Sequence, residues 1–502
     1  MDLLHNLALG FSVALTMQNL FCAFAGCLLG MVIGVLPGVG PALAIAMLLP
    51  ATHALAPAPA LIMLAGIYYG AQYGGAATAI LADLPDKSPP AAMIDGLQMA
   101  RKGRAGPALA AAGIGSFIAG CFGVLMLTVF AAPLTRMAFA FGPAEYFSLM
   151  ALGLTGAVAL APGSLVKAIG MAVLGLLLGL AGADAMPGAA RFSSGIPELT
   201  GGAGVIVIAT GLFGYGQIIA ALSRPQEKRQ FLAASLKHIY PTAEDLKLMT
   251  PAILRGTLLG ALLGVLPGGG ALLSAFAARA LEKKTRLKPG EAPFGKGNIR
   301  GVAAPESASN AGAQTAFIPL LMLGIPPNAV MALMAGAMAI HGIQPGPQAM
   351  AGNPGLFWGL IASMWIGNLM LLVLNLPLIG LWSKLLALPY RWLFPAIVLL
   401  CALGVYSING DAGDVWMAGW LGIAGYVFIK LDMEPALLLL GFILGPMMSK
   451  NLLEALHQSG GDWSVLLTRP LSASLLTVAA LLLVIALLPA VKTRRKKVFA
   501  EG

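Results

Sequence analysis

The sequence predicts an all-α polytopic membrane protein of two inverted-topology repeats, each with a re-entrant hairpin and a polar, interrupted helix. Three observations support this prediction. The 502-residue chain is 58% hydrophobic and only 10% charged, whereas soluble domains carry about 25% charged residues. Many apolar runs reach the ~20 residues that a bilayer crossing needs. A glycine-rich segment containing Leu-Pro-Gly occurs twice.

The two copies of this segment are residues 26–40 (GCLLGMVIGVLPGVG) and residues 256–270 (GTLLGALLGVLPGGG). They match at ten of fifteen positions, including five glycines and the proline. Weaker matches follow between residues 77–79 and 314–316, 84–85 and 325–326, and the segments from 212 and from 442. The repeat therefore spans most of each half of the chain.

The distribution of lysine and arginine assigns the sides of the membrane, because cytoplasmic loops carry the excess of basic residues. The segment after the second copy is strongly basic: Arg279, Lys283, Lys284, Arg286, Lys288, Lys296 and Arg300. Its counterpart, residues 51–60, has neither lysine nor arginine. The basic run 101–104 likewise corresponds to residues 341–348, which lack both. The two halves are therefore expected to face opposite ways.

The predicted elements follow in order along the chain, with roughly eleven crossings and two hairpins. The first helix is either interfacial or spanning, and we expect no removable signal peptide because a basic leading segment is missing. The segments are 1–19, the first helix; 20–222, the first repeat, with its hairpin at 20–50; 223–250, a cytoplasmic linker; 251–449, the second repeat, with its hairpin at 251–281; 450–470, a periplasmic segment; 471–491, the final transmembrane helix; and 492–502, a basic cytoplasmic tail.

Each hairpin is expected to present its glycine-rich tip near the middle of the membrane, because arms of ~15 residues must enter and return on the same side. Open backbone groups and half-helix N-termini at such tips favour an anion. Glycines that only permit close helix packing are the alternative, which the duplication with proline disfavours. The tip residues are Pro37, Gly38 and Gly40, and Pro267, Gly268, Gly269 and Gly270.

A small and polar segment follows each hairpin, at residues 66–85 and 301–327. Polar groups at membrane depth are costly without partners, so they are functional candidates, and interhelical hydrogen bonding is the alternative. The candidates for substrate contact are Gly74, Gly75, Thr78, Ser309, Asn310 and Thr315; those for a coupling cation are Glu306, Ser307 and Gln314. Glu306 follows Pro305, so it either caps a helix N-terminus or helps a cation bind.

The sequence contains no recognisable catalytic apparatus. Its five histidines are scattered, its four cysteines lie singly, and HExxH, GxSxG and Walker A motifs are missing. We therefore expect no enzyme activity, no cofactor and no metal beyond Na⁺, with energy from an ion gradient or a partner protein. The net charge of +10 is concentrated in loops, which argues against a nucleic-acid partner.

Several motifs together resemble the large membrane subunit of the bacterial tripartite tricarboxylate transporters, from about residue 20 to residue 457. They include GVLPGVGPALAIAMLLPATH, GIYYGAQYGGAATAIL, GVLPGGGA and FGKGNIRGVAAPESASNAGAQTAFIPLLMLGIPP. The resemblance implies an inner-membrane permease that imports tricarboxylates or related carboxylates with Na⁺ (or H⁺). It also implies two partners, a small membrane subunit and a periplasmic solute-binding protein.

We expect this permease to work in the lipid bilayer by alternating access, with a hairpin-bearing core moving against a scaffold of residues 144–222 and 395–448. A membrane-embedded enzyme acting on a lipid and a passive anion channel are the alternatives.

Overall fold

The computed structural model describes most of the chain. The described ranges are 3–36, 40–83, 91–161, 163–181, 204–223, 230–231, 240–268, 270–375, 377–385 and 390–488. These ranges are helical throughout, apart from connecting turns and two two-residue strands, β1 (Ala82–Asp83) and β2 (Gln230–Phe231), which pair antiparallel. The predicted all-α class is therefore confirmed.

In the first half, one helix ends at Val35 and the next begins at Pro41, and a second interruption follows the helix that ends at Leu81. The helices of this half are α1 (Leu3–Ala14), α2 (Met17–Val35), α3 (Pro41–Thr52), α4 (Pro57–Leu81), α5 (Met93–Arg101), α6 (Ala105–Ala138), α7 (Pro143–Leu160), α8 (Leu165–Leu180), α10 (Val205–Ala209), the π-helix η1 (Thr210–Tyr215) and α11 (Gly216–Leu222).

The second half shows similar breaks, at residues 266–270 and around residues 324–328. Its helices are α12 (Ala243–Val265), α13 (Ala271–Lys283), α14 (Arg300–Thr315), the π-helix η3 (Pro319–Leu323), α15 (Ala329–Ile340), α16 (Pro347–Gly352), α17 (Pro354–Asn375), α18 (Ile379–Leu385), α19 (Tyr390–Asn409), α20 (Ala412–Lys430), α21 (Pro435–Gln458), α22 (Val465–Thr468) and α23 (Pro470–Leu487).

Nine helices in the described part of the chain are long and apolar enough to cross a membrane. They include α2 and α12, with 19 and 23 residues, where the sequence suggested hairpin arms of ~15 residues. α12 begins at Ala243, inside the segment assigned to the linker, because Thr242 and Asp245 form a capping box. α1 has 12 residues, which is short of a crossing.

Glycines on α2 and α12 allow these helices to pack closely on α4 and α14, respectively. A Cβ at any of these glycines would overlap a backbone carbonyl of the neighbouring helix. On α2 the pairs are Gly26–Met63, Gly30–Ile67 and Gly34–Ala71; on α12 they are Gly256–Ala304, Gly260–Ala308 and Gly264–Gly312. Residue numbers rise together in both sets, so each helix runs parallel to its neighbour.

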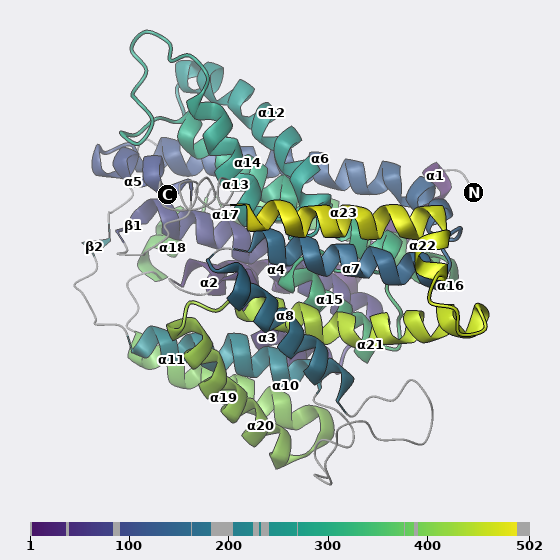
Figure 1. The fold of residues 1–502 in the computed structure, drawn as a ribbon. Helices are drawn as coiled ribbons and strands as arrows, with labels where there is room; N and C mark the ends of the chain where they lie inside the picture. The colour runs from purple at the N-terminus through teal and green to yellow at the C-terminus, as the bar shows by residue number, and fades with distance from the viewer. Residues whose placement is uncertain are drawn as a thin grey trace.

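The loops of the two halves meet at opposite ends of the helices. At one end the rings of His53 and His341 lie 6.5 Å apart. The other end lies at the far end of α4. There Oδ2 of Asp95, on α5, lies 3.4 Å from Nη2 of Arg279, and the ammonium group of Lys102 donates to the carbonyl of Lys296. In Figure 1, α5 lies at the left and α16 and α22 lie at the right. The loops rich in lysine and arginine therefore gather at one end.

Candidate functional site

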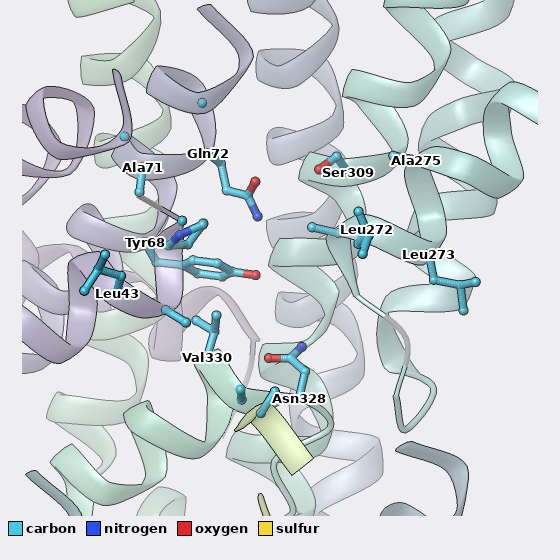
Figure 2. A pocket seen from close by; sticks show the side chains of 18 of the residues that line it. Leu43, Tyr68, Ala71, Gln72, Leu272, Leu273, Ala275, Ser309, Asn328 and Val330 are labelled. Atoms are coloured by element: carbon cyan, nitrogen blue, oxygen red, sulfur yellow. The ribbon is translucent and has the colours of Figure 1, made fainter. Parts of the chain in front are cut away.

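A cavity of about 660 Å³ lies where the two breaks of the first half meet the two breaks of the second. Its walls include Gly40 and Gly268, from the two segments that contain Leu-Pro-Gly, together with parts of α4, α14 and α15. The C-terminal end of α7 and the N-terminal end of α21 line one side, through Leu160 and Leu437. Figure 2 shows side chains from both halves facing each other across this space.

Five helices begin at the cavity wall. α3 begins there with Pro41 after Gly40, α13 with Ala271, α15 with Ala329 after Asn328, α5 with Met93, and α21 directly after Glu434. The N–H groups of a first helical turn have no partner within the helix, and the helix dipole places about half a positive charge there. Several positive helix ends therefore converge on one space, which favours an anion.

The charged side chains that line the cavity are both acidic: Glu306 on α14 and Glu434 before α21. The described lining contains neither lysine nor arginine. An anion bound here would therefore rely on backbone N–H groups, helix ends and neutral side chains, and a cation would find carboxylate oxygens nearby.

Glu306 is the more unusual of the two acids. It is only 8% exposed, and its carboxylate has neither an ion-pair partner nor a hydrogen-bond donor among the described residues. The interpretation as a helix cap is wrong, because α14 begins at Arg300 and continues through Pro305. A buried carboxylate without a partner is costly unless it binds something, so the cation interpretation stays open.

Polar side chains from both halves project toward the centre of the cavity. Tyr68 and Gln72 come from α4, Ser309 from α14, and Asn328 from the start of α15 (Figure 2). Asn328 also caps α15, since its Oδ1 accepts from the N–H of Met331 at 3.0 Å. Our sequence reasoning missed Gln72, Tyr68 and Asn328, although Gln72 and Tyr68 lie in the polar segment 66–85.

Six of the residues proposed from sequence line this cavity. They are Gly40, Gly75, Thr78, Gly268, Glu306 and Ser309. Gly75 has open space where a Cβ would lie, and Gly268 has a φ of 73°, which favours glycine. The hydroxyl of Thr78 donates to the carbonyl of Val35 at 2.6 Å, so its proton already has an acceptor.

The other described candidates lie outside the cavity lining. Three have packing roles: Gly74 packs on α2, Pro267 packs against Gly156, and Gly270 precedes α13 with a φ of 106°. Three have polar contacts: Asn310 donates to Ser116 at 2.7 Å, and Ser307 and Thr315 bond to carbonyls of their own helix. Gln314 is buried with its Oε1 unpartnered. Pro37, Gly38 and Gly269 lie outside the described residues.

Among the described residues, no group of three or more histidine, cysteine or acidic side chains could hold a metal ion. The carboxylate of Glu306 and the oxygen atoms of Ser309 and Asn328 line the same cavity. Such hard oxygen ligands suit an alkali or alkaline-earth cation better than a transition metal.

Comparison with known proteins gives a family and two bacterial relatives. The sequence model of the tripartite tricarboxylate transporter TctA family matches residues 20–440. An uncharacterized 52.8 kDa protein in the TAR-I ttuC' 3'region of Agrobacterium vitis is 53% identical over 502 residues, covering 100% of this chain and 99% of the relative. An uncharacterized protein in the TAR-II ttuC' 3'region of the same species is 54% identical over 242 residues, covering 48% of this chain and 99% of the relative. No solved structure matches.

Proposed function

Because the chain belongs to the tripartite tricarboxylate transporter TctA family, we propose that it is the permease of a secondary transporter that imports tricarboxylates or related carboxylates. It acts in the bacterial inner membrane with a small membrane subunit and a periplasmic solute-binding protein. The observation that supports this proposal most strongly is the convergence of the N-termini of α3, α5, α13 and α15 on one cavity.

The cavity suits a small polyanion in size, and the helix ends around it favour negative charge. Its volume of about 660 Å³ lies within the range typical of small-molecule sites. The helix ends supply partial positive charge from several directions, and the amides of Gln72 and Asn328 can donate to carboxylate oxygens. A carboxylate held in this way needs no buried lysine or arginine.

We also propose that the two halves are inverted repeats with re-entrant hairpins. The packing of α2 on α4 recurs for α12 on α14. Equivalent glycines of α2 and α12 are 230 positions apart in the sequence, and the residues that they contact on α4 and α14 are 241 positions apart. Pro85 and Pro326 are also 241 positions apart. On this register Tyr68 and Ser309 are equivalent, and both line the cavity.

The path of the chain supports the hairpin assignment. Since α2 runs parallel to α4, and α3 ends at Thr52 shortly before α4 begins at Pro57, α3 must return toward the end where α2 began. In the second half, the ion pair between Arg255 of α12 and Glu282 at the end of α13 supports the same return of the chain. The sequence match of residues 77–79 with 314–316 has an offset of 237 positions. It therefore differs by four positions, about one helical turn, from the offset of 241 that the packing gives.

Coupling to Na⁺ is assigned to Glu306 in this proposal. Its carboxylate is buried, forms part of the cavity wall and has no partner in the part of the chain that the structure describes. A bound cation would therefore compensate its charge and lower the local repulsion toward an anionic solute. Binding of the two ions then becomes cooperative, and alternating access carries them together down the Na⁺ gradient.

The test is uptake into proteoliposomes that contain the chain and its partner subunits. Radiolabelled citrate, isocitrate, succinate and malate are offered in turn under an inward gradient of NaCl, with choline chloride as the control. We expect saturable accumulation of at least one of these acids that depends on Na⁺. Non-saturable flux would identify a channel, chemical conversion of a lipid would identify an enzyme, and no response to any acid would contradict the proposal.

A pair of variants tests the cavity itself. Gln72→Leu keeps the side-chain volume but removes an amide donor from the cavity wall, and we expect KM to rise about tenfold for a lost hydrogen bond to a charged group. Gln458→Leu, at the exposed end of α21, is the matched control and is expected to leave KM unchanged. Equal KM values for both variants would remove Gln72 from the site.

A further inference from the structure

A second cavity, of about 760 Å³, lies further along three of the helices that line the first. On α7 it reaches Met150, whereas the first cavity reaches Ala157 and Leu160. On α15 it reaches Ala335, whereas the first reaches Val330. The two spaces are therefore arranged in series along the same wall.

The two cavities come closest along α21. Leu440 lines the first cavity and Phe442 the second, although they are only two residues apart on α21, a rise of about 3 Å. The segment between η3 and α15 crosses the same boundary, since Gly324 lines the second cavity and Pro327 the first.

The crossing segment is built differently from the helices on either side. Gly324 has a left-handed φ of 75°, and the two prolines after Ile325 have no N–H to donate. Ile325 is buried, with its Cγ2 3.4 Å from where a Cβ on Gly153 would lie. The segment is held by three backbone hydrogen bonds: the N–H groups of Gly324 and Ile325 donate to carbonyls of η3, and the N–H of Gly268 donates to the carbonyl of Pro327. A shift must exchange these few bonds rather than a whole helical ladder, so this segment is the part of the boundary that moves most easily.

The second cavity lies toward the outer end of the protein. Its wall contains residues 342–345, next to the His53–His341 contact, and Gly142, next to the Arg469–Glu145 ion pair. Both positions belong to segments that the distribution of lysine and arginine assigns to the outside. The lining of the first cavity includes Glu434 and Ala161, at the ends of α21 and α7 that lie away from the second cavity.

The polar lining of this second cavity combines one basic and one acidic side chain with three amides. Among the described lining residues, Lys450 is the cation and Glu454 the acid, and the amides are those of Gln344, Gln348 and Asn451. Lys450 lies 4.0 Å from Glu454, and both side chains are about half exposed, at 58% and 49%. A pair so long and so exposed is weak, which leaves the ammonium group able to attract a carboxylate.

We propose that this second cavity is the outer access chamber for the carboxylate solute and that residues 324–327 form the gate to the central cavity. The inference rests on the proposed transport function. It adds to that function an entry route for the solute, a gate on this route, and a basic side chain, Lys450, that attracts the solute. The solute enters beside Lys450, and the gate then transfers it to the helix ends around Gly40 and Gly268.

Thiol labelling tests the route. Ala335→Cys, deep in the outer chamber, is made in a background with the four native cysteines replaced by alanine, and Ala339→Cys is the second chamber variant if the first misfolds. Thr468→Cys, exposed on the outer segment but outside the chamber, is the matched control. A membrane-impermeant methanethiosulfonate is added from outside, and uptake of radiolabelled citrate, or of the acid found to be transported, is measured.

We expect both chamber variants to be labelled and to lose about nine-tenths of their uptake, a tenfold change, while labelled Thr468→Cys transports normally. Full labelling of a chamber variant with unchanged uptake would overturn the inference, and so would failure of folded chamber variants to react. Either result leaves the proposed function intact, because that is judged from uptake by the unlabelled protein.

Lys450 provides an independent test. Lys450→Gln is expected to raise KM several-fold while kcat stays unchanged, because the charge acts on capture rather than on the central site. Lys450→Arg is expected to restore the KM, and added salt is expected to shrink the difference between wild type and Lys450→Gln. A KM for Lys450→Gln equal to that of wild type at low salt would remove Lys450 from the chamber's function.

Discussion

Two buried acids in this protein show opposite kinds of environment. Asp95 is fully buried, and its Oδ1 accepts from the N–H groups of Gly295, Gly297 and Asn298 at 2.6, 3.2 and 3.0 Å, while Arg279 lies beside Oδ2. Glu306 is also buried, but among the described residues its carboxylate has no such donors. A buried carboxylate whose oxygens are hydrogen-bonded stabilises the fold, whereas one without hydrogen-bond donors is available to bind a ligand.

Asp95→Ala is expected to destabilise the protein severely. Removing this carboxylate leaves Arg279 and three N–H groups buried without partners, a loss of about 3–5 kcal/mol by analogy with broken buried ion pairs. The melting temperature of purified protein in detergent measures the loss. Asp411→Asn, on an exposed loop, is the control and should melt like wild type. Equal melting temperatures for Asp95→Ala and wild type would show that the cluster is not structural.

Glu306→Gln is expected to fold at least as stably as wild type, because it removes an uncompensated buried charge. The same variant should lose the stabilisation by NaCl that a specific cation site gives the wild type through linkage. Melting curves in NaCl and in choline chloride measure both effects. Glu434→Gln, the other acid in the lining, is expected to keep the response to Na⁺, and a retained response in Glu306→Gln would place the cation elsewhere.

The contact between His53 and His341 predicts a dependence of stability on pH. Burial and the neighbouring His53 lower the pKa of His341 below 6.5. The unfolded chain therefore binds a proton before the folded chain does, so stability should fall as pH falls through this range. Comparing melting temperatures at about pH 7.5 and about pH 5.5 in wild type and His341→Asn tests this. An identical loss in both proteins would assign the effect to other groups.

At the scale of helices, the two glycine-lined pairs α2–α4 and α12–α14 act as rigid units. Each pair brings one backbone against another with no side chain between them. Such close contact gives extensive van der Waals packing and suits a membrane interior, where the hydrophobic effect does not drive helices together.

Gly30→Ala and Gly260→Ala are expected to weaken these pairs by about 1–3 kcal/mol each, because the new methyl group must push a helix backbone away. Gly170→Ala on α8, where a Cβ meets no atom within 4 Å, is the control and should be neutral or slightly stabilising. Melting temperatures in detergent compare the three. Unchanged stability in both test variants would show that the helices can separate without loss.

The sequence was sufficient for the helix class, for the basic and non-basic ends, and for six residues of the cavity. These follow from local signals: apolar length, lysine and arginine counts, and a repeated Leu-Pro-Gly. Gln72, Tyr68 and Asn328 were missed because only the three-dimensional arrangement shows which face of α4 and which helix start border the cavity. Glu306 was misread as a possible cap because Pro305 suggests a helix start, whereas α14 begins five residues earlier, at Arg300.

At the scale of the whole molecule, the proposed inversion predicts the sidedness of every loop. An epitope inserted at Gly290, a turn with open space around it, is expected to be reached only from the cytoplasm. The same epitope at Gly461, equally open, is expected to be reached only from outside. Antibody binding to intact and permeabilised cells measures both. Accessibility of both sites from one side would contradict the inverted arrangement.

The helix ends around the central cavity also bear on how quickly the protein can let go of its cargo. The backbone groups that carry these partial charges do not titrate, and each binds a carboxylate more weakly than a guanidinium group does. The contribution of the helix ends to binding is therefore modest and does not change with pH, so any dependence on pH must come from Glu306, Glu434 or the carboxyl groups of the guest. Rapid turnover needs such loose holding, since a solute bound too tightly would stay in the carrier.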